Sequence, residues 1–286
     1  MITLRLKNKY CIPSRWADFS LEHQKQFINL CTHLDDFEKG LLSFEQFKMM
    51  IVFALLYLNP EDVRINGKAS DNLYENMFRI AELLDFPYQL QDNEDGTMTV
   101  HVRISLCRNL LSGYRFEVSP AGLVDCSLKA EQYVDALALM ELYTRSRSDE
   151  ALMKLCEALN GKTDGLSRKE MVAAYYNFRG ILDWIQKLPQ YSIIFSRKTG
   201  RISGESPLGL SSSIFALSKS GYGTLKEIQD LDVFTYLGAL AQLSIESIRQ
   251  LASAGLKPVQ IADKLNLPVS EVLPHVTVND DYEHSL

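Results

Sequence analysis

The sequence has few cysteines, and their spacing is the first informative absence. There are five in 286 residues, an odd number, and no two of them form a CxxC pair. They are widely scattered, at Cys11, Cys31, Cys107, Cys126 and Cys156. This usage argues against a disulfide framework and is typical of reduced, buried thiols in a cytosol-like compartment.

Long hydrophobic runs and a secretory leader are also missing. The most apolar stretch, Met49–Leu58, is about half the length needed to span a bilayer. The opening residues MITLRLKNKY contain no apolar segment of the kind that a signal peptide carries. We therefore expect a soluble protein with no membrane partner.

Positive charge is in deficit. The 30 Lys and Arg residues are outnumbered by 36 Asp and Glu residues, giving a formal net charge of −6 and a pI near 5.5. Binding to a polyanion requires surplus cations to neutralise phosphates. The balance thus disfavours nucleic acid as the main partner, although a local basic patch stays open.

Motifs for catalysis, cofactors and metals are absent. The five histidines show no ligand spacing with one another or with cysteine, and no GxSxG sequence is present. Asn160-Gly161-Lys162-Thr163 resembles the end of a phosphate-binding loop, but Cys156 stands where the first glycine is required. We predict no enzyme, no cofactor and no metal, while a site assembled from distant residues stays open.

Residues 91–96, Gln-Asp-Asn-Glu-Asp-Gly, superficially suggest a calcium loop. The first ligand position would be Gln91 and the twelfth Val102, so the set of oxygen ligands fails. A hairpin turn explains Asp95-Gly96 better, because this pair readily adopts positive φ. The flanking alternation predicts a β-hairpin over 86–106.

The composition that remains, 46% hydrophobic and 23% charged residues, is that of an ordinary globular protein. We predict that residues 1–120 form an α+β portion that contains this hairpin and an opening strand at Thr3–Lys7. Helices are expected to begin after Ser20 and at the capping box Ser43–Gln46. The fold class is therefore mainly α with a small β-hairpin.

Residues 121–286 predict a helical portion. Its expected helices are Leu128–Arg145, Asp149–Leu159 and Ser167–Leu188, with further starts at Thr224, Asp232 and Ser244. Between them, Ser196–Ser213 is rich in Gly and Ser and predicts a mobile loop. Its cations Arg197, Lys198 and Arg201 predict contact with an acidic partner surface or a phosphate; a solvated loop is the simpler interpretation.

The stretch 247–276 has the spacing of a helix-turn-helix and predicts a terminal tri-helix. Gly255 and Pro258 mark its first turn. In DNA-binding modules of this kind the last helix presents polar or basic side chains to base edges. Here that helix carries Glu271 and no Lys or Arg, and Pro274 interrupts it. If the stretch binds DNA, Arg249, Lys257 and Lys264 are the cations available; the alternative is a bundle used for protein contacts.

Several short segments together resemble a known group. Ile12-Pro13-Ser14-x-Trp16 followed by Ser20-Leu21-x-x-Gln24 is similar to the opening of proteins encoded in the tail-gene clusters of tailed bacterial phages and prophages. Asn72-Leu73-Tyr74 ahead of a helix that ends at Phe86-Pro87-Tyr88, and Ser220-Gly-Tyr-Gly223 ahead of a helix over 224–243, are similar too. The resemblance implies a helical, non-enzymatic virion-assembly protein of the tail-assembly-chaperone kind.

From this resemblance we expect protein subunits as partners, such as a tape-measure-like or tail-tube protein, with a homo-oligomer as a further alternative. We expect the protein in the cytoplasm of the bacterial host cell or associated with the virion. A helix-turn-helix DNA-binding regulator is the alternative function.

Overall fold

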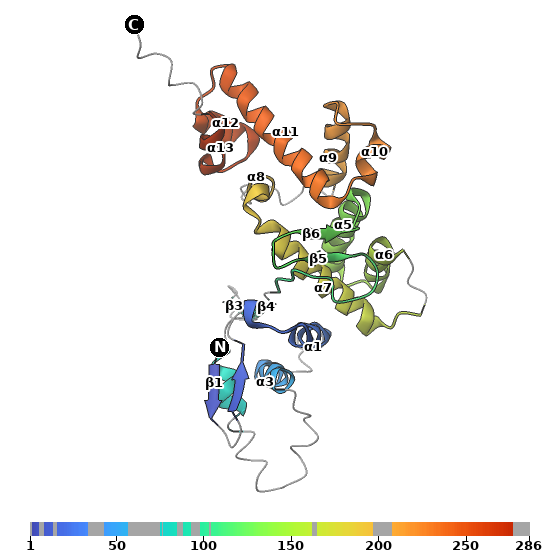
Figure 1. Cartoon of the computed structure of the whole chain (residues 1–286), viewed down its shortest axis with the longest axis vertical. Helices are drawn as coiled ribbons and strands as arrows, with labels where there is room; N and C mark the ends of the chain where they lie inside the picture. The colour runs from blue at the N-terminus through green and yellow to red at the C-terminus, as the bar shows by residue number, and fades with distance from the viewer. Residues whose placement is uncertain are drawn as a thin grey trace. The chain divides into compact units, whose positions relative to one another are not determined.

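The computed structural model describes residues 2–5, 9–13, 16–33, 43–56, 75, 77–84, 88–92, 98–102, 104–161, 165–196 and 208–276. Within these residues the protein is mainly α-helical, with three two-stranded antiparallel hairpins (Figure 1). The predicted fold class, mainly α with a small β-hairpin, is confirmed. Two of the three hairpins are additional to the predicted one.

Contacts between Cα atoms divide the chain into two units. The first is Met1–Ser112 with Asp164–Ile181, and the second is Gly113–Thr163 with Leu182–Leu286. The boundary predicted from the sequence at residue 120 differs from this division. The prediction assumed that each portion is one continuous segment of the chain. Here Asp164–Ile181 belongs with residues far earlier in the chain.

Among the described residues, the first unit contains two hairpins, a short 3-10 helix and four α-helical segments. Its named elements are β1 Ile2–Arg5, β2 Lys9–Ile12, η1 Trp16–Asp18, α1 Leu21–Cys31, α3 Phe44–Leu55, β3 Tyr88–Asp92, β4 Met98–Val102 and most of α7 Arg168–Gln186. Residues 77–82 are helical as well.

Side-chain caps start α1 and α3 where the sequence predicts them. Ser20 Oγ accepts a hydrogen bond from His23 N at 3.1 Å. Ser43 and Gln46 form a reciprocal capping box, with bonds of 2.8 and 3.2 Å. Leu21, however, is 41% exposed rather than part of the buried face of α1. As the first residue of the helix, its side chain points back beyond the helix end.

The predicted hairpin over 86–106 is present as β3 and β4. Their antiparallel register pairs Tyr88 with Val102 and Asp92 with Met98. The Asp95-Gly96 turn lies outside the described residues. A second hairpin, β1 with β2, pairs Ile2 with Ile12 and includes most of the predicted opening strand.

Helix α7 is buried on almost every side within the first unit. From Val172 to Ile181 every residue except Arg179 is buried. Gly180 is required there, because a Cβ would lie 2.5 Å from Ile104 Cγ2 and 2.8 Å from Leu106 Cγ. Asn177, the one buried polar residue among those described, accepts from Leu110 N at 3.0 Å and donates to Asn109 Oδ1 at 2.7 Å. These bonds fix the preceding chain against α7.

The second unit contains one hairpin and the remaining helices. Its elements are β5 Phe116–Val118, β6 Val124–Cys126, α5 Ala130–Ser146, α6 Asp149–Asn160, the end of α7, η2 Pro189–Tyr191, α8 Ser192–Phe195, α9 Leu208–Lys219, α10 Leu225–Asp230, α11 Val233–Ser253, α12 Pro258–Leu265 and α13 Val269–Val276.

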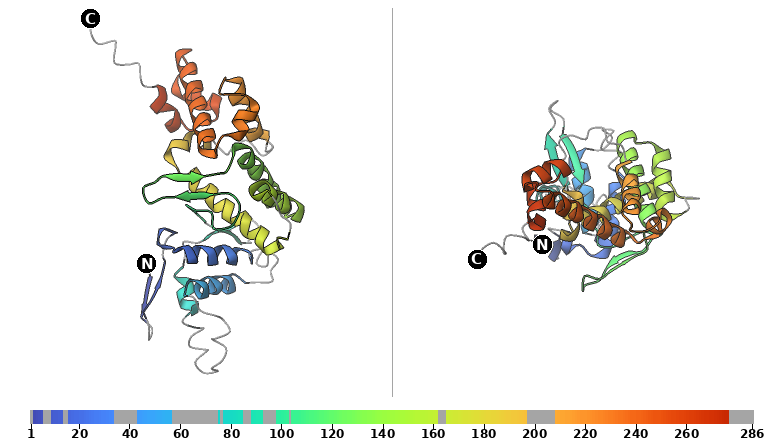
Figure 2. Two further views of the ribbon diagram at one scale, coloured as in Figure 1. Left: turned by 45° about the vertical axis from the view of Figure 1, so that its right-hand side comes forward. Right: turned by 90° about the horizontal axis from the view of Figure 1, so that it is seen from above.

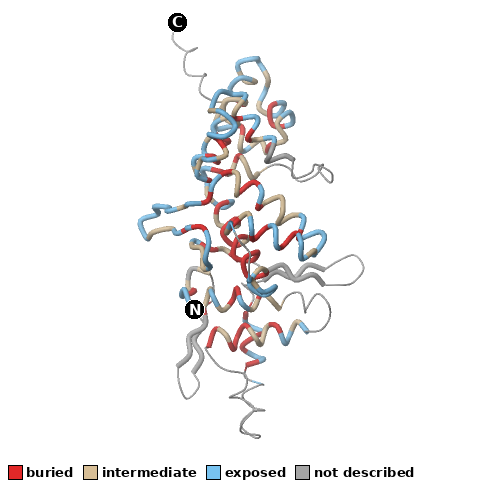
Figure 3. Tube along the Cα trace, turned by 90° about the vertical axis from the view of Figure 1, so that its right-hand side faces the viewer, coloured by how far each residue is buried: buried red, intermediate tan, exposed pale blue. Residues whose placement is uncertain are grey.

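Backbone bonds and aromatic rings join the elements of this unit. Ala130 N donates to Leu231 O at 2.8 Å and Val233 N to Leu128 O at 3.0 Å, which ties the start of α5 to the start of α11. The Phe116 ring lies between the rings of Trp184 and Phe234, with centroids 5.7 and 6.1 Å away. The outer part of the β5–β6 hairpin extends away from the helices of its unit (Figure 2) and is exposed (Figure 3).

Two sequence predictions in this unit are wrong in part. The expected loop Ser196–Ser213 is helical from Leu208 onward, since α9 begins there. Ser244 does not start a helix but lies inside α11, where its hydroxyl donates to Leu240 O at 2.9 Å. A serine that satisfies its hydroxyl with the preceding turn is compatible with a helix interior.

Candidate functional site

The predicted tri-helix exists and is the best-defined candidate site, consisting of α11, α12 and α13. Its first helix begins at Val233, well before the predicted boundary at Ser247. Gly255, at φ +83°, makes the turn into α12, where Leu256 N donates to Leu251 O at 3.2 Å. Asn266 ends α12 in the left-handed region at φ +55°. These two tight turns produce the helix-turn-helix geometry.

A small apolar core holds the three helices together. Ile248 of α11, Ile261 of α12 and Val272 of α13 are fully buried in it. One member was not predicted: Ile193 of α8, which is only 5% exposed. The core is therefore closed by four helices rather than three. Its buried members are Ile193, Ala241, Ile248, Ile261, Ala262, Leu267 and Val272.

The outward surface of α13 is uncharged and partly apolar. Ser270, Leu273 and Pro274 are its exposed residues, and Leu273 is 44% exposed. On α12, which packs against α13, Val259 is 57% exposed. A helix that reads DNA would present donors or cations at these places. This surface instead suits contact with another apolar surface.

The one acidic residue of α13 is held by α8. Ser192 Oγ donates to Glu271 Oε2 at 2.9 Å, and Ser196 Oγ donates to Glu271 Oε1 at 3.3 Å. The two serines lie one helical turn apart, so both oxygens of a single carboxylate are engaged. The sequence gives no signal for this contact, because more than seventy residues separate its partners.

The three cations of the DNA-binding alternative are all exposed, but they do not lie on α13. Arg249 is on α11, Lys257 precedes α12, and Lys264 is in the last turn of α12. Within the described part of the chain none of them forms an ion pair. The cations Arg197, Lys198 and Arg201, predicted to contact a partner, lie outside the described residues.

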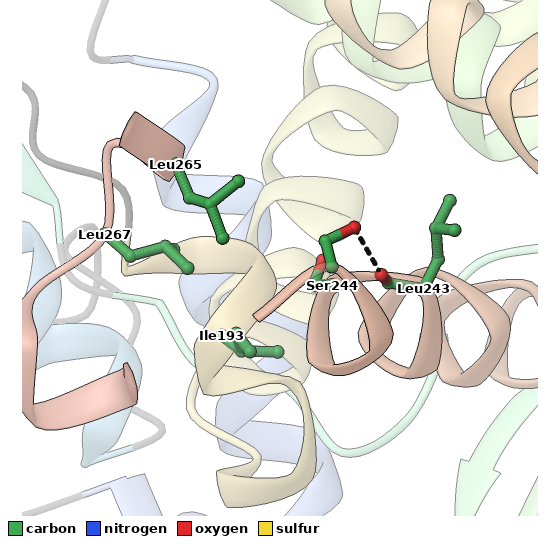
Figure 4. Close-up of a pocket in the computed structure, with 6 residues that line it drawn as sticks. Ile193, Leu243, Ser244, Leu265 and Leu267 are labelled. Atoms are coloured by element: carbon green, nitrogen blue, oxygen red, sulfur yellow. Dashed lines mark hydrogen bonds between the residues drawn. The ribbon is translucent and has the colours of Figure 1, made fainter. Parts of the chain in front are cut away.

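A pocket of about 170 Å³ opens beside α8 (Figure 4). It is lined by Ile193, Leu243, Ser244, Ser247, Leu265 and Leu267. The two serine hydroxyls donate to Leu240 O and Leu243 O, both at 2.9 Å, so neither needs a partner in the pocket. Ligand pockets are typically several hundred Å³. This one has the size for a single side chain.

Exposed apolar side chains also occur outside the tri-helix in the described residues. Leu123, at the turn of the β5–β6 hairpin, is 74% exposed, and Phe215 on α9 is 66% exposed. Exposed apolar residues are common on protein surfaces. Phe215 is therefore a suitable control for the tri-helix.

The phosphate-loop resemblance has a structural explanation. Gly161 ends α6 in the left-handed conformation at φ +76°, and its N–H donates to Glu157 O at 2.7 Å. Gly161 is therefore a helix C-cap, a position at which glycine is common. Lys162 and Thr163 lie outside the described residues.

The described residues contain no group of three or more His, Cys, Asp or Glu that could hold a metal ion. Burial raises the pKa of the Cys156 thiol to about 11 and raises that of Cys31 still further. Both thiols are therefore neutral near pH 7, which is the inert state of buried cysteine. None of the helices in the described part of the chain has the length and apolar character to cross a membrane.

Comparisons of this chain with protein-family models, with curated proteins and with solved structures found no match.

Proposed function

We propose that this protein acts by stoichiometric protein binding, without chemistry, and that the outer surface of its tri-helix is the contact site. The observation that carries the proposal is the exposed surface of α13, where Leu273 and Pro274 stand in place of donors and cations. Phosphate contacts supply most of the affinity of DNA-binding modules. An uncharged last helix favours a polypeptide partner instead.

The resemblance to tail-region proteins supplies the class of partner. A tail-assembly chaperone holds a tape-measure or tail-tube protein before it polymerises. In this proposal the protein works in the bacterial host cytoplasm or on the virion, and its partner covers Val259 and Leu273. A homo-oligomer formed through the same surface is the other protein-binding arrangement.

Co-expression with the product of an adjacent tape-measure-like or tube-like reading frame tests the proposal. The two chains should co-purify, and Leu273→Asp should weaken the complex by about a hundredfold, because a buried charge replaces an apolar contact. Phe215→Asp is the control, since it also replaces an exposed apolar side chain by aspartate, at a more exposed site on α9. Recovery of the wild-type protein as an inert monomer beside every such product would contradict the proposal.

The DNA-binding alternative is favoured by one observation: three exposed cations, Arg249, Lys257 and Lys264, border a helix-turn-helix. If this alternative is correct, the protein binds duplex DNA with an affinity that falls steeply with salt. Replacing all three cations by alanine should then reduce the salt slope by about 3. Absence of binding at low salt would eliminate it.

A further inference from the structure

Helix α8 occupies a groove on the tri-helix as a short ligand would. It has four residues, Ser-Ile-Ile-Phe, and packs against α11. Ile193 enters the apolar core, and Ile194 packs at its edge. The attachment thus consists of two adjacent aliphatic side chains and the two hydroxyl bonds to Glu271.

The polar half of this attachment leaves a carboxylate without a counter-ion among the described residues. There Glu271 accepts from two neutral hydroxyls, and no lysine or arginine of the described residues pairs with it. An ammonium or guanidinium donor would add the attraction of opposite charges to the hydrogen bond. A segment that brings a cation to Glu271 would therefore make an ion pair that α8 lacks.

The apolar half is incomplete. The pocket is bounded by Ile193 of α8, Leu243 of α11, Leu265 at the end of α12 and Leu267 of the α12–α13 connection (Figure 4). Its volume of about 170 Å³ accommodates one more aliphatic side chain. Among the residues of α8, only Ile193 lines it.

We propose that the groove between α11 and the α12–α13 connection is a peptide-binding site, which α8 occupies until a partner segment displaces it. The occupant is a short helical segment with two adjacent branched aliphatic residues, a third aliphatic residue for the pocket, and a lysine or arginine that pairs with Glu271. This proposal rests on the proposed function, because it specifies the chemistry of the polypeptide that the tri-helix binds.

A fluorescent peptide with a sequence based on α8 tests the site on the full-length chain. The probe is Pro189–Ser196 with Ser196→Lys, and the control peptide also carries Ile193→Ala and Ile194→Ala. In the protein, Ser192→Ala with Ser196→Ala removes the hydroxyl bonds of α8. We expect this variant to bind the lysine peptide at least about tenfold tighter than the wild type does, because its own α8 competes less.

Glu271→Gln in the same double-alanine background should weaken peptide binding by about tenfold, since the charge-assisted bond is lost. Glu150→Gln, the same change at an exposed site on α6, is the control and should leave the affinity unchanged. Equal affinity with and without the Glu271 carboxylate overturns the proposal. So does equal affinity for the two peptides.

Hydrogen exchange of the wild-type protein gives a second readout that needs no variant. Saturating peptide should accelerate exchange across 189–196, including the Ser196 N–H that bonds to Ser192 O at 2.8 Å. Exchange within α11 should not rise. Binding without this acceleration places the peptide elsewhere and overturns the proposal.

The two proposals fail separately. If Leu273→Asp disrupts the partner complex while the peptide does not bind, the groove is not the site and the proposed function stands. If the peptide binds as described while the protein recovers no assembly partner, the groove stands and the proposed function fails.

Discussion

Helices α7 and α13 are both rich in apolar residues but use them differently. In α7 every residue from Val172 to Leu182 except Arg179 is buried. In α13 Val272 is the one fully buried residue, and Leu273 and Pro274 face outward. The apolar composition of α7 is accounted for by the core. That of α13 exceeds what its small core requires, which leaves Leu273 and Pro274 exposed.

The largest expected effect contrasts Phe178 with Leu273. Phe178→Ala should lower the free energy of unfolding by about 3–5 kcal/mol, because it leaves a cavity in place of a fully buried ring. Leu273→Ala should change it by no more than about 0.5 kcal/mol, as is usual for exposed positions. Chemical denaturation followed by circular dichroism measures both. Similar losses for the two variants would show that α13 is packed as tightly as α7.

Asn177→Ala tests the polar contact of α7. The substitution leaves Leu110 N without its acceptor and Asn109 Oδ1 without one of its donors. We expect a loss of about 2 kcal/mol in unfolding free energy, since a partly buried N–H is left unsatisfied. Ser270→Ala, on the outer surface of α13, is the control and should have almost no effect. A neutral result for Asn177→Ala would mean that the contact does not fix the chain against α7.

Val272→Ala measures how firmly the small core of the tri-helix holds α13. Val272 is fully buried, so removing two methyl groups should cost about 2 kcal/mol. Val259→Ala makes the same chemical change at a site that is 57% exposed and should be close to neutral. The comparison is read from thermal unfolding of the two variants. Identical melting curves would indicate that α13 is not docked.

The smallest effect concerns the start of α7. The Ser167 hydroxyl and the Ser167 backbone N–H each donate a hydrogen bond to Glu170 Oε2 at 2.7 Å. These two bonds, with the side-chain bond as the larger cause, hold the pKa of Glu170 below its ordinary value. A lowered folded-state pKa stabilises the protein above the unfolded-state value and loses this contribution as the pH falls. The stability difference between the wild type and Glu170→Gln should therefore be present at pH 7. It should decline from about pH 4.5 downward, through the lower pKa of the folded state.

Melting temperatures of both proteins, measured from pH 3 to pH 7, give this difference. This range of about four pH units covers the titration of a glutamate near its reference pKa. A constant difference over the whole range would exclude the carboxylate as its source. Because Glu170 is fully exposed, solvent screens the interaction and the shift should be small.

Local signals were sufficient to locate many elements. Helices begin where the sequence predicts them at Ser20, Ser43, Ser167, Thr224 and Asp232, and a side chain caps each of these starts. Each of these depends on residues within about four positions of one another. The helix-turn-helix spacing is also a local signal of this type, and its two turns form at Gly255 and Asn266.

Long-range pairings could not be predicted in this way. The insertion of Ile193 into the tri-helix core and the bonds from Ser192 and Ser196 to Glu271 join segments that no periodicity connects. The same applies to Gly180, whose necessity depends on Ile104 and Leu106. The candidate site was thus located by sequence only in part: its helices were predicted, while the fourth helix that closes it was not.

The sequence by itself determined the mainly helical fold, the caps and turns, and the absence of cations from the last helix, because these depend on the chemistry of neighbouring residues. Only the tertiary structure decided which apolar faces are consumed by a core and which stay exposed. It alone also showed that α8 covers a groove on the tri-helix. Burial depends on which distant segments meet, and that is a property of the folded chain rather than of any local pattern.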